Sequence, residues 1–524
     1  MGVIEKEIGD VKRFDEIMRT LAEAEMGIIA HRLNLSHRLP GLKKFRVSKD
    51  RPAPERVREV FEELGPTFIK FGQILAQRPD LLPEEYTEEL EKLEDEVPAF
   101  PPDRAKQIID EEIGLERFAE IKDEPVAAAS IAQVHEGRLE NGDRVAIKVR
   151  RPGIKEQIEK DLDILRFLAR RGEKHVEKLK DVRIEKVVEK FGSWTQEEMN
   201  LEREGRNADV LRENLEDEEK IKIPEIHMDL TTRKVLTMEY VEGVKSNDQE
   251  ALKEMDIDKH ELARTAIRAG LKQIVRDGFF HADPHPSNFL VDEEGNLVHL
   301  DFGMVGKLTK NKRKYLGLLL IHAIQEDADS ALEDVKHIGT VQEDADLDGL
   351  KEEIEEKILL IRNTTLEEHS ITRQLLDITV TATEKGVYMP TSFVIMGKSL
   401  VTMEGIGLRL YPDFQITDEL KPTVKRILIE EYSPENMFED FAVDMMENAD
   451  LIEELPSKLN QLADQKEQQV KVVNENTDSP QLTVVAALII ASSILLLQSL
   501  TPDLALLVAL LEMAAAVIYY ELHH

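Results

Sequence analysis

The chain of 524 residues contains no cysteine, which excludes disulfides, iron–sulfur clusters, thiol nucleophiles and cysteine-ligated zinc sites. Basic residues are outnumbered by acidic ones, because 69 Lys and Arg stand against 105 Asp and Glu and give a net charge of −36 at pH 7. A general nucleic-acid binder needs a concentrated basic surface that releases counterions from phosphates. The charge balance therefore argues against nucleic acid as a partner.

Long apolar runs are missing from the N-terminal region, so no export signal is expected there. Two such runs lie near the C-terminus, at Leu482–Leu500 and Leu504–Tyr520, separated by a Thr-Pro-Asp break that favours a tight hairpin. At about 1.5 Å per helical residue, the first run reaches roughly the thickness of a hydrocarbon core. We therefore predict a transmembrane helical hairpin at residues 482–520.

The basic residues before this hairpin, Lys466 and Lys471, favour a cytoplasmic position for both of its ends. The protein is then membrane-anchored, with the lipid bilayer as a partner and its catalytic domain in the cytoplasm. Glu512 interrupts the second run, and an ionisable group in lipid must face a partner helix, be protonated or lie near the interface. The alternative is a helical hairpin buried in a soluble protein or at an oligomer interface, and a homodimer is one candidate assembly.

The pattern changes from helical to stranded and back along the chain, which is typical of a two-lobed α+β protein with a site at the junction. The predicted divisions are an N-terminal helical extension (1–100), a β-rich lobe (101–241), a helical lobe (242–463), an acidic and polar linker (464–481) and the two-helix membrane anchor (482–520). In the β-rich lobe, one helix is expected from about Trp194 to Leu215.

A β-hairpin is predicted where strands at 130–139 and 144–151 flank Asn141-Gly142, because both turn positions are expected to take a positive φ. The second strand gathers its β-branched residues on one face, namely Val145, Ile147 and Val149. Lys148 therefore points away from the apolar layer.

Two short apolar segments, Phe289–Val291 and Leu297–Leu300, are expected to pair as a second hairpin. This pairing brings Asp301 beside Asn288, with Asp283 on the loop just before. Oxygen ligands on adjacent strand ends suit Mg²⁺, which completes its octahedron with waters and phosphate oxygens. We predict that Asn288 and Asp301 bind Mg²⁺ and that Asp283 orients or deprotonates a hydroxyl or water.

The order H-x-D-x-x-x-x-N followed by D-F-G matches the phosphoryl-transfer signature of kinase-like folds. Lys148 ends the motif Val-Ala-Ile-Lys, whose ammonium contacts the phosphates of ATP and pairs with a helix carboxylate. Glu198 and Glu204 are the candidate partners. On one continuous helix they point in directions that differ by roughly 120°, so both cannot meet Lys148 equally.

A zinc site is the alternative interpretation of this loop, because His281, Asp283 and His285 alternate as metal ligands can. A zinc hydrolase would need a further ligand to close the coordination, and Pro284 and Pro286 fit a loop better than a ligand strand. We therefore expect structural roles for both histidines.

Lys70, Gly72 and Gln73 stand together amid apolar residues in a segment of helical pattern, residues 66–83. Alanine is a better helix former than glycine, so Gly72 indicates close approach to another element. Lys70 is then a candidate partner for the glutamate that Lys148 does not take. Taken alone, the segment fits an amphipathic surface helix better.

The loop before the first predicted strand is Ala127-Ala128-Ala129-Ser130 and contains no glycine. Glycines let backbone N–H groups wrap phosphates at positive φ, which the methyl group of alanine disfavours. We therefore expect nucleotide phosphates to be held differently and transfer to a protein hydroxyl to be hindered.

These motifs together resemble the UbiB-type atypical kinases, also called the aarF-domain family. The similarity runs through nearly the whole chain and is carried by six segments, Lys70–Gln73, Ala127–His135, Val145–Lys148, Thr231–Tyr240, His281–Phe289 and Asp301–Gly303. The KxGQ helix and the alanine loop discriminate, because ordinary kinases and aminoglycoside-type phosphotransferases lack both. The paired apolar segments at the C-terminus also look like the membrane anchor of bacterial members.

The resemblance implies a protein-kinase-like fold that binds ATP with Mg²⁺, a helical extension over the protein-substrate groove, and ATPase rather than routine protein-kinase activity. It also implies a role in isoprenoid-quinone biosynthesis, such as that of ubiquinone, or in related lipid metabolism, with such lipids or lipid-modifying enzymes as partners. By this matching Lys148 pairs with Glu204 and Lys70 lies near Glu198, although the two glutamates could be exchanged.

The resemblance also makes Met238 a gatekeeper before a hinge at Glu239–Val241. The residues expected around the nucleotide are Lys70, Gln73, Ala127, Ala128, Ala129, Ser130, Lys148, Glu198, Glu204, Met238, Glu239 and Val241. One departure is that the family's E-x-D element reads Glu198-Met199-Asn200 here, which thins the carboxylate network around Lys70. Two rival functions stay open: a kinase for a small hydroxylated or lipid substrate, and a nucleotide-gated scaffold without catalysis.

Overall fold

The computed structural model describes residues 10–23, 53–79, 81–93, 97–175, 180, 184–363, 371–411 and 422–427. The chain divides into two compact units, Met1–Ser433 and Pro434–His524, and every described residue belongs to the first. The predicted linker and the predicted membrane hairpin at 482–520 lie outside the described residues. Within the described ranges, no helix is both long and apolar enough to cross a bilayer.

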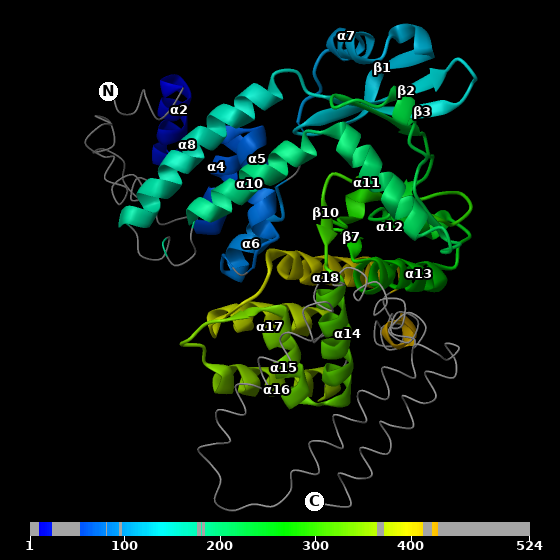
Figure 1. The fold of residues 1–524 in the computed structure, drawn as a ribbon. Coiled ribbons are helices and arrows are strands. Elements are labelled where there is room, and N and C mark those ends of the chain that lie inside the picture. Colours follow the sequence, from blue (N-terminus) through cyan, green and yellow to red (C-terminus); the bar gives the residue numbers. More distant parts are fainter. Residues whose placement is uncertain are drawn as a thin grey trace, which may run out of the picture. The chain divides into compact units, whose positions relative to one another are not determined.

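An antiparallel four-stranded sheet forms the β-rich lobe, in the order β1-β2-β3-β5. Its strands are β1 (Phe118–Ala128), β2 (Ala132–Leu139), β3 (Arg144–Arg150) and β5 (Val235–Glu239). Helix α7 (Pro102–Glu112) packs on one face and buries Val145, Ile147 and Val149 completely (Figure 1). Ala146 on the opposite face packs toward α11 (Leu201–Asn214), so the predicted separation of the two faces of β3 is confirmed.

The hairpin between β2 and β3 differs from the prediction at its turn. Gly142 has a φ of +97°, whereas Asn141 is not among the described residues with positive φ. The Asn141 side chain instead accepts a hydrogen bond from the Asp143 backbone N–H (3.1 Å). An Asx-type bond thus fixes the turn where a second left-handed residue was expected.

The sequence predicts a loop at Ala127–Ser130 before its first strand, whereas Ala127 and Ala128 are the last residues of the additional strand β1. Most of its residues are exposed or half-buried, and its register with β2 is interrupted by several irregularities. These features remove the alternation of apolar and polar residues by which a half-buried strand is recognised.

The single helix predicted over Trp194–Leu215 is wrong. The chain forms α10 (Ile184–Glu198) and α11, and it breaks at Asn200, whose φ and ψ are −99° and 89°. Arg150 holds the break by donating from Nη1 to the Met199 carbonyl (3.0 Å). The directions of Glu198 and Glu204 therefore belong to two helices and do not follow from one helical period.

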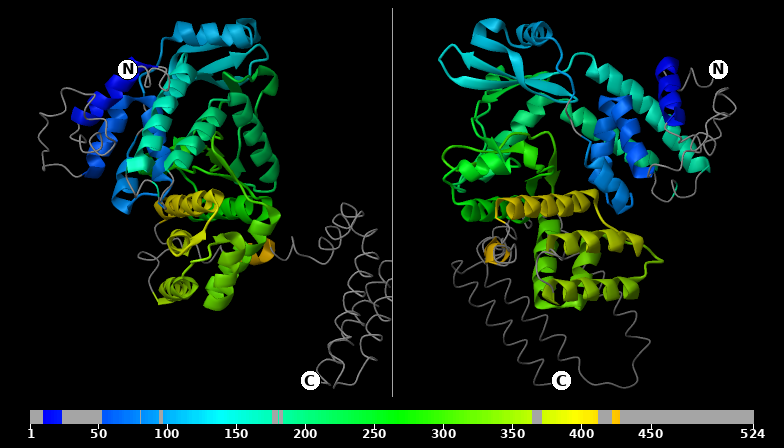
Figure 2. Two further views of the ribbon diagram at one scale, coloured as in Figure 1. Left: turned by 60° about the vertical axis from the view of Figure 1, so that its left-hand side comes forward. Right: turned by 180° about the vertical axis from the view of Figure 1, so that it is seen from behind.

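The N-terminal extension contains α2 (Val11–Glu23), α4 (Ala53–Leu64), α5 (Pro66–Ala76) and α6 (Glu84–Leu90). Helices α2 and α5 contact α8 (Ile154–His175), and α5 also contacts α10; Figure 2 shows this group of helices from two sides. Helix α5 is buried along most of its length, including Lys70. It is therefore a core helix of the extension and not the amphipathic surface helix that its segment alone would suggest.

Gly72 on α5 lies where no side chain fits. A Cβ atom there would stand 2.3 Å from Leu93 Cδ1 and 2.7 Å from Phe61 Cδ2, so the close approach predicted from the sequence is confirmed. We expect Gly72→Ala to lower the free energy of unfolding by about 1–3 kcal/mol through overpacking. Gly405→Ala is the matched control, because it is also helical and nothing lies within 4 Å of its added Cβ. Denaturant unfolding that gives equal changes for both would contradict this account.

The rest of the first unit is mostly helical, as predicted. Its helices are α12 (Gln249–Glu254), α13 (Lys259–Leu271), which continues into a π-helical turn at Lys272–Asp277, α14 (Lys310–Gln325), α15 (Ala328–Ile338), α16 (Leu347–Asn363), α17 (Ile371–Glu384) and α18 (Thr391–Leu410). Short strands pair as β4 (Ile221–Lys222), β9 (Leu297–His299), β8 (Phe289–Val291) and β6 (Val244–Lys245), as β7 (Phe279–His281) with β10 (Val305–Lys307), and as β11 (Thr340–Val341) with β12 (Val387–Tyr388).

Candidate functional site

The hairpin that carries the candidate site forms as the sequence predicts. Phe289 on β8 pairs with His299 on β9, and the Leu300 backbone N–H donates to the Asn288 carbonyl (3.0 Å). Asp301 is the second residue after β9, next to Leu300, and therefore lies near Asn288. Asp283 lies between β7 and the 3₁₀ turn Pro286–Asn288. Local strand pairing thus brings Asp301 near Asn288 and Asp283, which precede it by more than ten residues.

Lys148 brings the two lobes together at this hairpin. Its Nζ lies 2.6 Å from Glu204 Oε1 on α11 and 3.5 Å from Asp301 Oδ2. The Glu204 side chain is only 2% exposed, whereas that of Asp301 is 41% exposed. Glu204 thus anchors the lysine from the interior, and Asp301 presents a carboxylate that a ligand can reach.

Charge and burial shift the pKa values of all three groups. Burial alone would lower the pKa of Lys148, but the carboxylates of Asp301 and Glu204 outweigh it and raise that pKa. Burial raises the pKa of Glu204 to about 7 against the opposing charge of Lys148. Burial also opposes ionisation of Asp301, yet Lys148, the Gly303 backbone N–H (2.8 Å) and other cations lower its pKa to about 2. Lys148 and Asp301 are therefore both charged at neutral pH.

Lys70 takes the second glutamate. Its Nζ lies 2.5 Å from Glu198 Oε1, and Lys70 also contributes to the lowered pKa of Asp301. A Cβ atom on Gly303 would lie 3.3 Å from Glu198 Cγ, so the end of α10 approaches the Asp-Phe-Gly segment. The structure thus contains the pairing that the family resemblance implied, Lys148 with Glu204 and Lys70 with Glu198. The exchanged arrangement is not observed.

Asn288 is oriented by the loop that precedes it. Its Nδ2 donates to the Asp283 carbonyl (3.2 Å), and the Asp283 backbone N–H donates to His281 Nδ1 (3.1 Å). With its nitrogen so engaged, the amide of Asn288 keeps its oxygen for another partner. An amide oxygen and an ionised carboxylate on adjacent strand ends are a donor set that fits Mg²⁺, which needs few protein ligands.

The two histidines of the loop lie in different surroundings. His281 is buried, its backbone N–H donates to Gln273 Oε1 (3.0 Å), and its carbonyl accepts from Ser399 Oγ (2.9 Å). His285 is exposed and caps the following turn through Ser287. Over the described residues, no group of three or more His, Asp and Glu is arranged to hold a metal.

The alanine loop is a tight turn that closes the β1–β2 hairpin. Ala127 pairs with Val134 and Ala128 with Gln133, and the Ala129 backbone N–H donates to the Ala132 carbonyl (2.7 Å). Ser130 is buried at the turn. Val134, two residues after the start of β2, lies directly opposite Lys148 on β3, so the turn lies near Lys148 at the same end of the sheet.

The structure places the remaining predicted residues on β5, just after it, and on α5. Met238 is buried opposite Ala146, and Glu239 pairs with Lys222 (2.6 Å) just before Val241. Gln73 Nε2 donates to the Leu93 carbonyl (3.3 Å), so its amide ties α5 to the residues after α6.

Sequence reasoning missed Asn207, whose Nδ2 donates to the Phe302 carbonyl (3.0 Å) and so ties α11 to the Asp-Phe-Gly segment. The available signal was its position three residues after Glu204 on an otherwise charged helix. Asn200, which stands where the family has Asp, precedes α11 and makes no side-chain capping bond. Its amide oxygen is buried without a hydrogen-bond partner in the described part of the chain.

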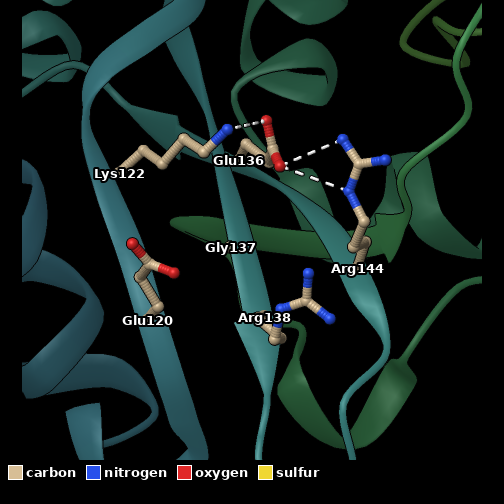
Figure 3. Close-up of a pocket in the computed structure, with 6 residues that line it drawn as sticks. All are labelled: Glu120, Lys122, Glu136, Gly137, Arg138 and Arg144. Carbon is tan, nitrogen blue, oxygen red and sulfur yellow. Dashed lines mark hydrogen bonds and ion pairs between the residues drawn. The ribbon is translucent and has the colours of Figure 1, made fainter.

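A pocket of about 290 Å³ lies on the sheet away from these residues (Figure 3). Its lining residues are Glu120, Lys122, Glu136, Gly137, Arg138 and Arg144. Glu136 holds Lys122 at 2.7 Å and Arg144 at 3.1 Å. Strand register puts Glu136 opposite Ala146, on the face of Lys148 but toward the other end of β3. None of the predicted site residues lines this pocket.

The pKa of Glu204 gives a pH prediction that concerns stability. Because unfolded glutamate ionises near pH 4.3, the folded protein binds the extra proton between that pH and about 7. Folding stability contributed by this site therefore falls as pH rises through this window. Buried His281 and His299, whose pKa values are lowered by burial, act in the opposite sense below about pH 6.5.

The measurement is consequently a difference between variants. As pH rises from about 5 to 7, we expect the free energy of unfolding of Glu204→Gln to increase relative to that of the unmodified protein, by about 3 kcal/mol for the whole pKa shift. Denaturant unfolding at several pH values checks this. Parallel stability curves for the two proteins would contradict it.

Comparison with known proteins gives two domain matches, the ABC1 atypical kinase-like domain over residues 92–335 and the UbiB helical domain over residues 354–415. "Probable protein kinase UbiB" of Marinobacter nauticus is 36% identical over 375 residues, which cover 70% of this chain and 69% of that protein. "Uncharacterized protein sll1770" of Synechocystis sp. is 35% identical over 376 residues, which cover 71% of this chain and 64% of that protein, less than two thirds. A solved structure titled "The complex structure of Rv3197-erythromycin from Mycobacterium tuberculosis" has a TM-score of 0.48 at 24% identity and covers 70% of this chain and 94% of that one.

Proposed function

Because the chain belongs to the ABC1/UbiB family of atypical kinase-like proteins, we propose that it binds and hydrolyses Mg-ATP. We further propose that it does so at a membrane, in support of isoprenoid-quinone or related lipid metabolism. The observation that carries the proposal is the meeting of Lys148, Glu204 and Asp301 beside Asn288. A permanently charged ammonium next to an accessible carboxylate suits a triphosphate and its metal ion.

Each residue of the site has a distinct role in this proposal. Lys148, held by Glu204, contacts the phosphates, and Asn288 and Asp301 hold Mg²⁺, which would neutralise charge on the phosphate oxygens. Asp283 orients the attacking water from the adjoining loop. The alanine turn and the segment Met238–Val241 enclose the rest of the nucleotide.

Hydrolysis is preferred over transfer to a protein because of what surrounds Lys148. Lys70 on the buried helix α5 is paired to Glu198, which approaches Gly303. The extension thus occupies a position next to the Asp-Phe-Gly segment that a protein substrate would need to approach. A water molecule is small enough to reach the half-buried Asp283 even with the extension in this position.

The proposed membrane location rests on the apolar runs at 482–500 and 504–520. An anchor of this kind places the site close to lipids that are too apolar to diffuse through water. Isoprenoid and quinone-type lipids have this property, which is why we propose them, or the enzymes that modify them, as partners.

The test is ATP hydrolysis by the full chain in liposomes with Mg²⁺, with and without a long-chain isoprenoid quinone. We expect free phosphate release that requires Mg²⁺ and rises with the lipid. With labelled ATP, a phosphorylated small molecule or lipid would replace the ATPase proposal by that of a kinase. Nucleotide binding without any turnover would favour a nucleotide-gated scaffold.

A further inference from the structure

Arg151, the first residue after β3, bridges two backbone segments that are far apart in the sequence. Its Nη2 donates to the Ala129 carbonyl (3.0 Å), and both Nη1 and Nη2 donate to the Pro98 carbonyl (3.1 Å each). Its backbone N–H donates to the Ile131 carbonyl (2.7 Å). The carbonyls on either side of Ser130 are therefore both held by this one residue.

A second set of contacts fixes the other end of the bridge. The guanidinium of Arg151 lies 5.5 Å from the ring centre of Phe100. The Phe100 backbone N–H donates to Gln133 Oε1 (2.9 Å), and Gln133 Nε2 donates to the Phe100 carbonyl (3.3 Å). Gln133 is fully buried and pairs with Ala128 in the sheet. The segment Pro98–Phe100 thus forms a rigid support against which Arg151 holds the turn.

We propose that Arg151 is a positioning residue that sets the alanine turn at the height above Lys148 that a nucleotide requires. This inference rests on the proposed function and deepens it. Alanine residues do not readily take the positive φ by which a glycine-rich loop adapts to phosphates. A turn that cannot adapt must already be in place, and a planar cation with several fixed donors can bridge two carbonyls where lysine, a point charge, cannot.

The test measures Mg-ATP binding by calorimetry and turnover in liposomes for Arg151→Ala and Arg151→Lys. We expect the dissociation constant to rise about tenfold in both variants while kcat changes less than twofold, because chemistry at Asp283 is untouched. Arg138→Ala is the matched control, since Arg138 also donates to a turn carbonyl, that of Gly142 (2.9 Å), in the other hairpin of β2. Its dissociation constant should be unchanged.

A double-mutant cycle separates positioning from general destabilisation. Once Ala129→Gly has loosened the turn, Arg151→Ala should add less than a twofold loss of affinity, whereas two independent effects would multiply. Faster exchange of the Ala129 amide hydrogen, which donates to the Ala132 carbonyl, is expected in Arg151→Ala and not in Arg138→Ala. Multiplying effects, or unchanged exchange and affinity in Arg151→Ala, would contradict the role of Arg151 alone. No binding of Mg-ATP by the unmodified chain would contradict the proposed function as well.

Discussion

Asp301→Asn is expected to reduce Mg-dependent ATP hydrolysis by about 10²–10³-fold, the loss typical when one group that stabilises developing charge is removed. The variant keeps the size of the side chain and the acceptor for the Gly303 N–H, but it loses the carboxylate that lies 3.5 Å from Lys148. A neutral amide is a weaker ligand for Mg²⁺ and no longer balances the ammonium. Phosphate release at saturating ATP is the measurement.

Asp283→Asn distinguishes the role of Asp283 from that of Asp301. Asp283 stands on the loop before Asn288, which it contacts through its backbone carbonyl, so the substitution leaves that contact intact. For Asp283→Asn we expect turnover to fall by about 10²-fold while Mg-ATP affinity stays nearly normal. Asp301→Asn should instead lower both turnover and Mg-ATP affinity. Asp229→Asn, at an exposed ion pair with Arg117 (2.7 Å), is the control and should change neither. Equal background rates in all of these proteins would favour the scaffold.

The residues that the sequence could locate are those arranged by local pairing. Asn288 and Asp301 are joined by a short hairpin, and Lys148 is oriented by strand alternation. Both arrangements follow from periodicity and turn residues, with no need for distant contacts. The resemblance to the UbiB family then supplied the pairing of Lys148 with Glu204, which the residues by themselves left open between two glutamates.

Other features depend on contacts that the sequence does not display. The break at Asn200 is held by Arg150 from strand β3, a contact that the sequence of the two helices does not display. Strand β1 is irregular and largely exposed, so its pattern is masked. The bridge from Arg151 to Pro98 and Ala129 joins backbone carbonyls, which carry no mark in the sequence. Long-range polar contacts of this kind are where prediction from a single chain fails.

One such contact did leave a signal. Asp161 stands on the apolar face of α8, among Ile154, Ile158, Leu162 and Leu165, and its side chain is 0% exposed. A buried carboxylate requires partners, and both come from the N-terminal extension. Arg13 donates from Nε (2.7 Å) and Nη2 (3.3 Å), and Thr67 donates from Oγ1 (2.6 Å).

Asp161→Leu is therefore expected to lower the free energy of unfolding by about 3–5 kcal/mol, because it removes the buried counter-charge of Arg13 and leaves that guanidinium with the largely exposed Glu16 (3.1 Å). The double variant Arg13→Met/Asp161→Leu should recover much of that loss, since two apolar side chains can replace a buried pair at little cost. Asp123→Asn, in an exposed pair with Lys106 (2.5 Å), is the control and should not move the unfolding midpoint. A single variant no less stable than the double would contradict the assignment.

The contacts of Arg13 and Thr67 with Asp161, here called the Asp161 clamp, also bear on the candidate site. Thr67 and Lys70 are one helical turn apart on α5, so the bond from Thr67 to Asp161 helps to fix the position from which Lys70 reaches Glu198. Loosening the clamp should therefore weaken the ion pair beside Gly303 as well as the packing of the extension. If so, Asp161→Asn, which keeps the shape of the side chain, should alter Mg-ATP affinity at temperatures well below its unfolding midpoint. An affinity that changes only where the protein unfolds would limit the clamp to a role in stability.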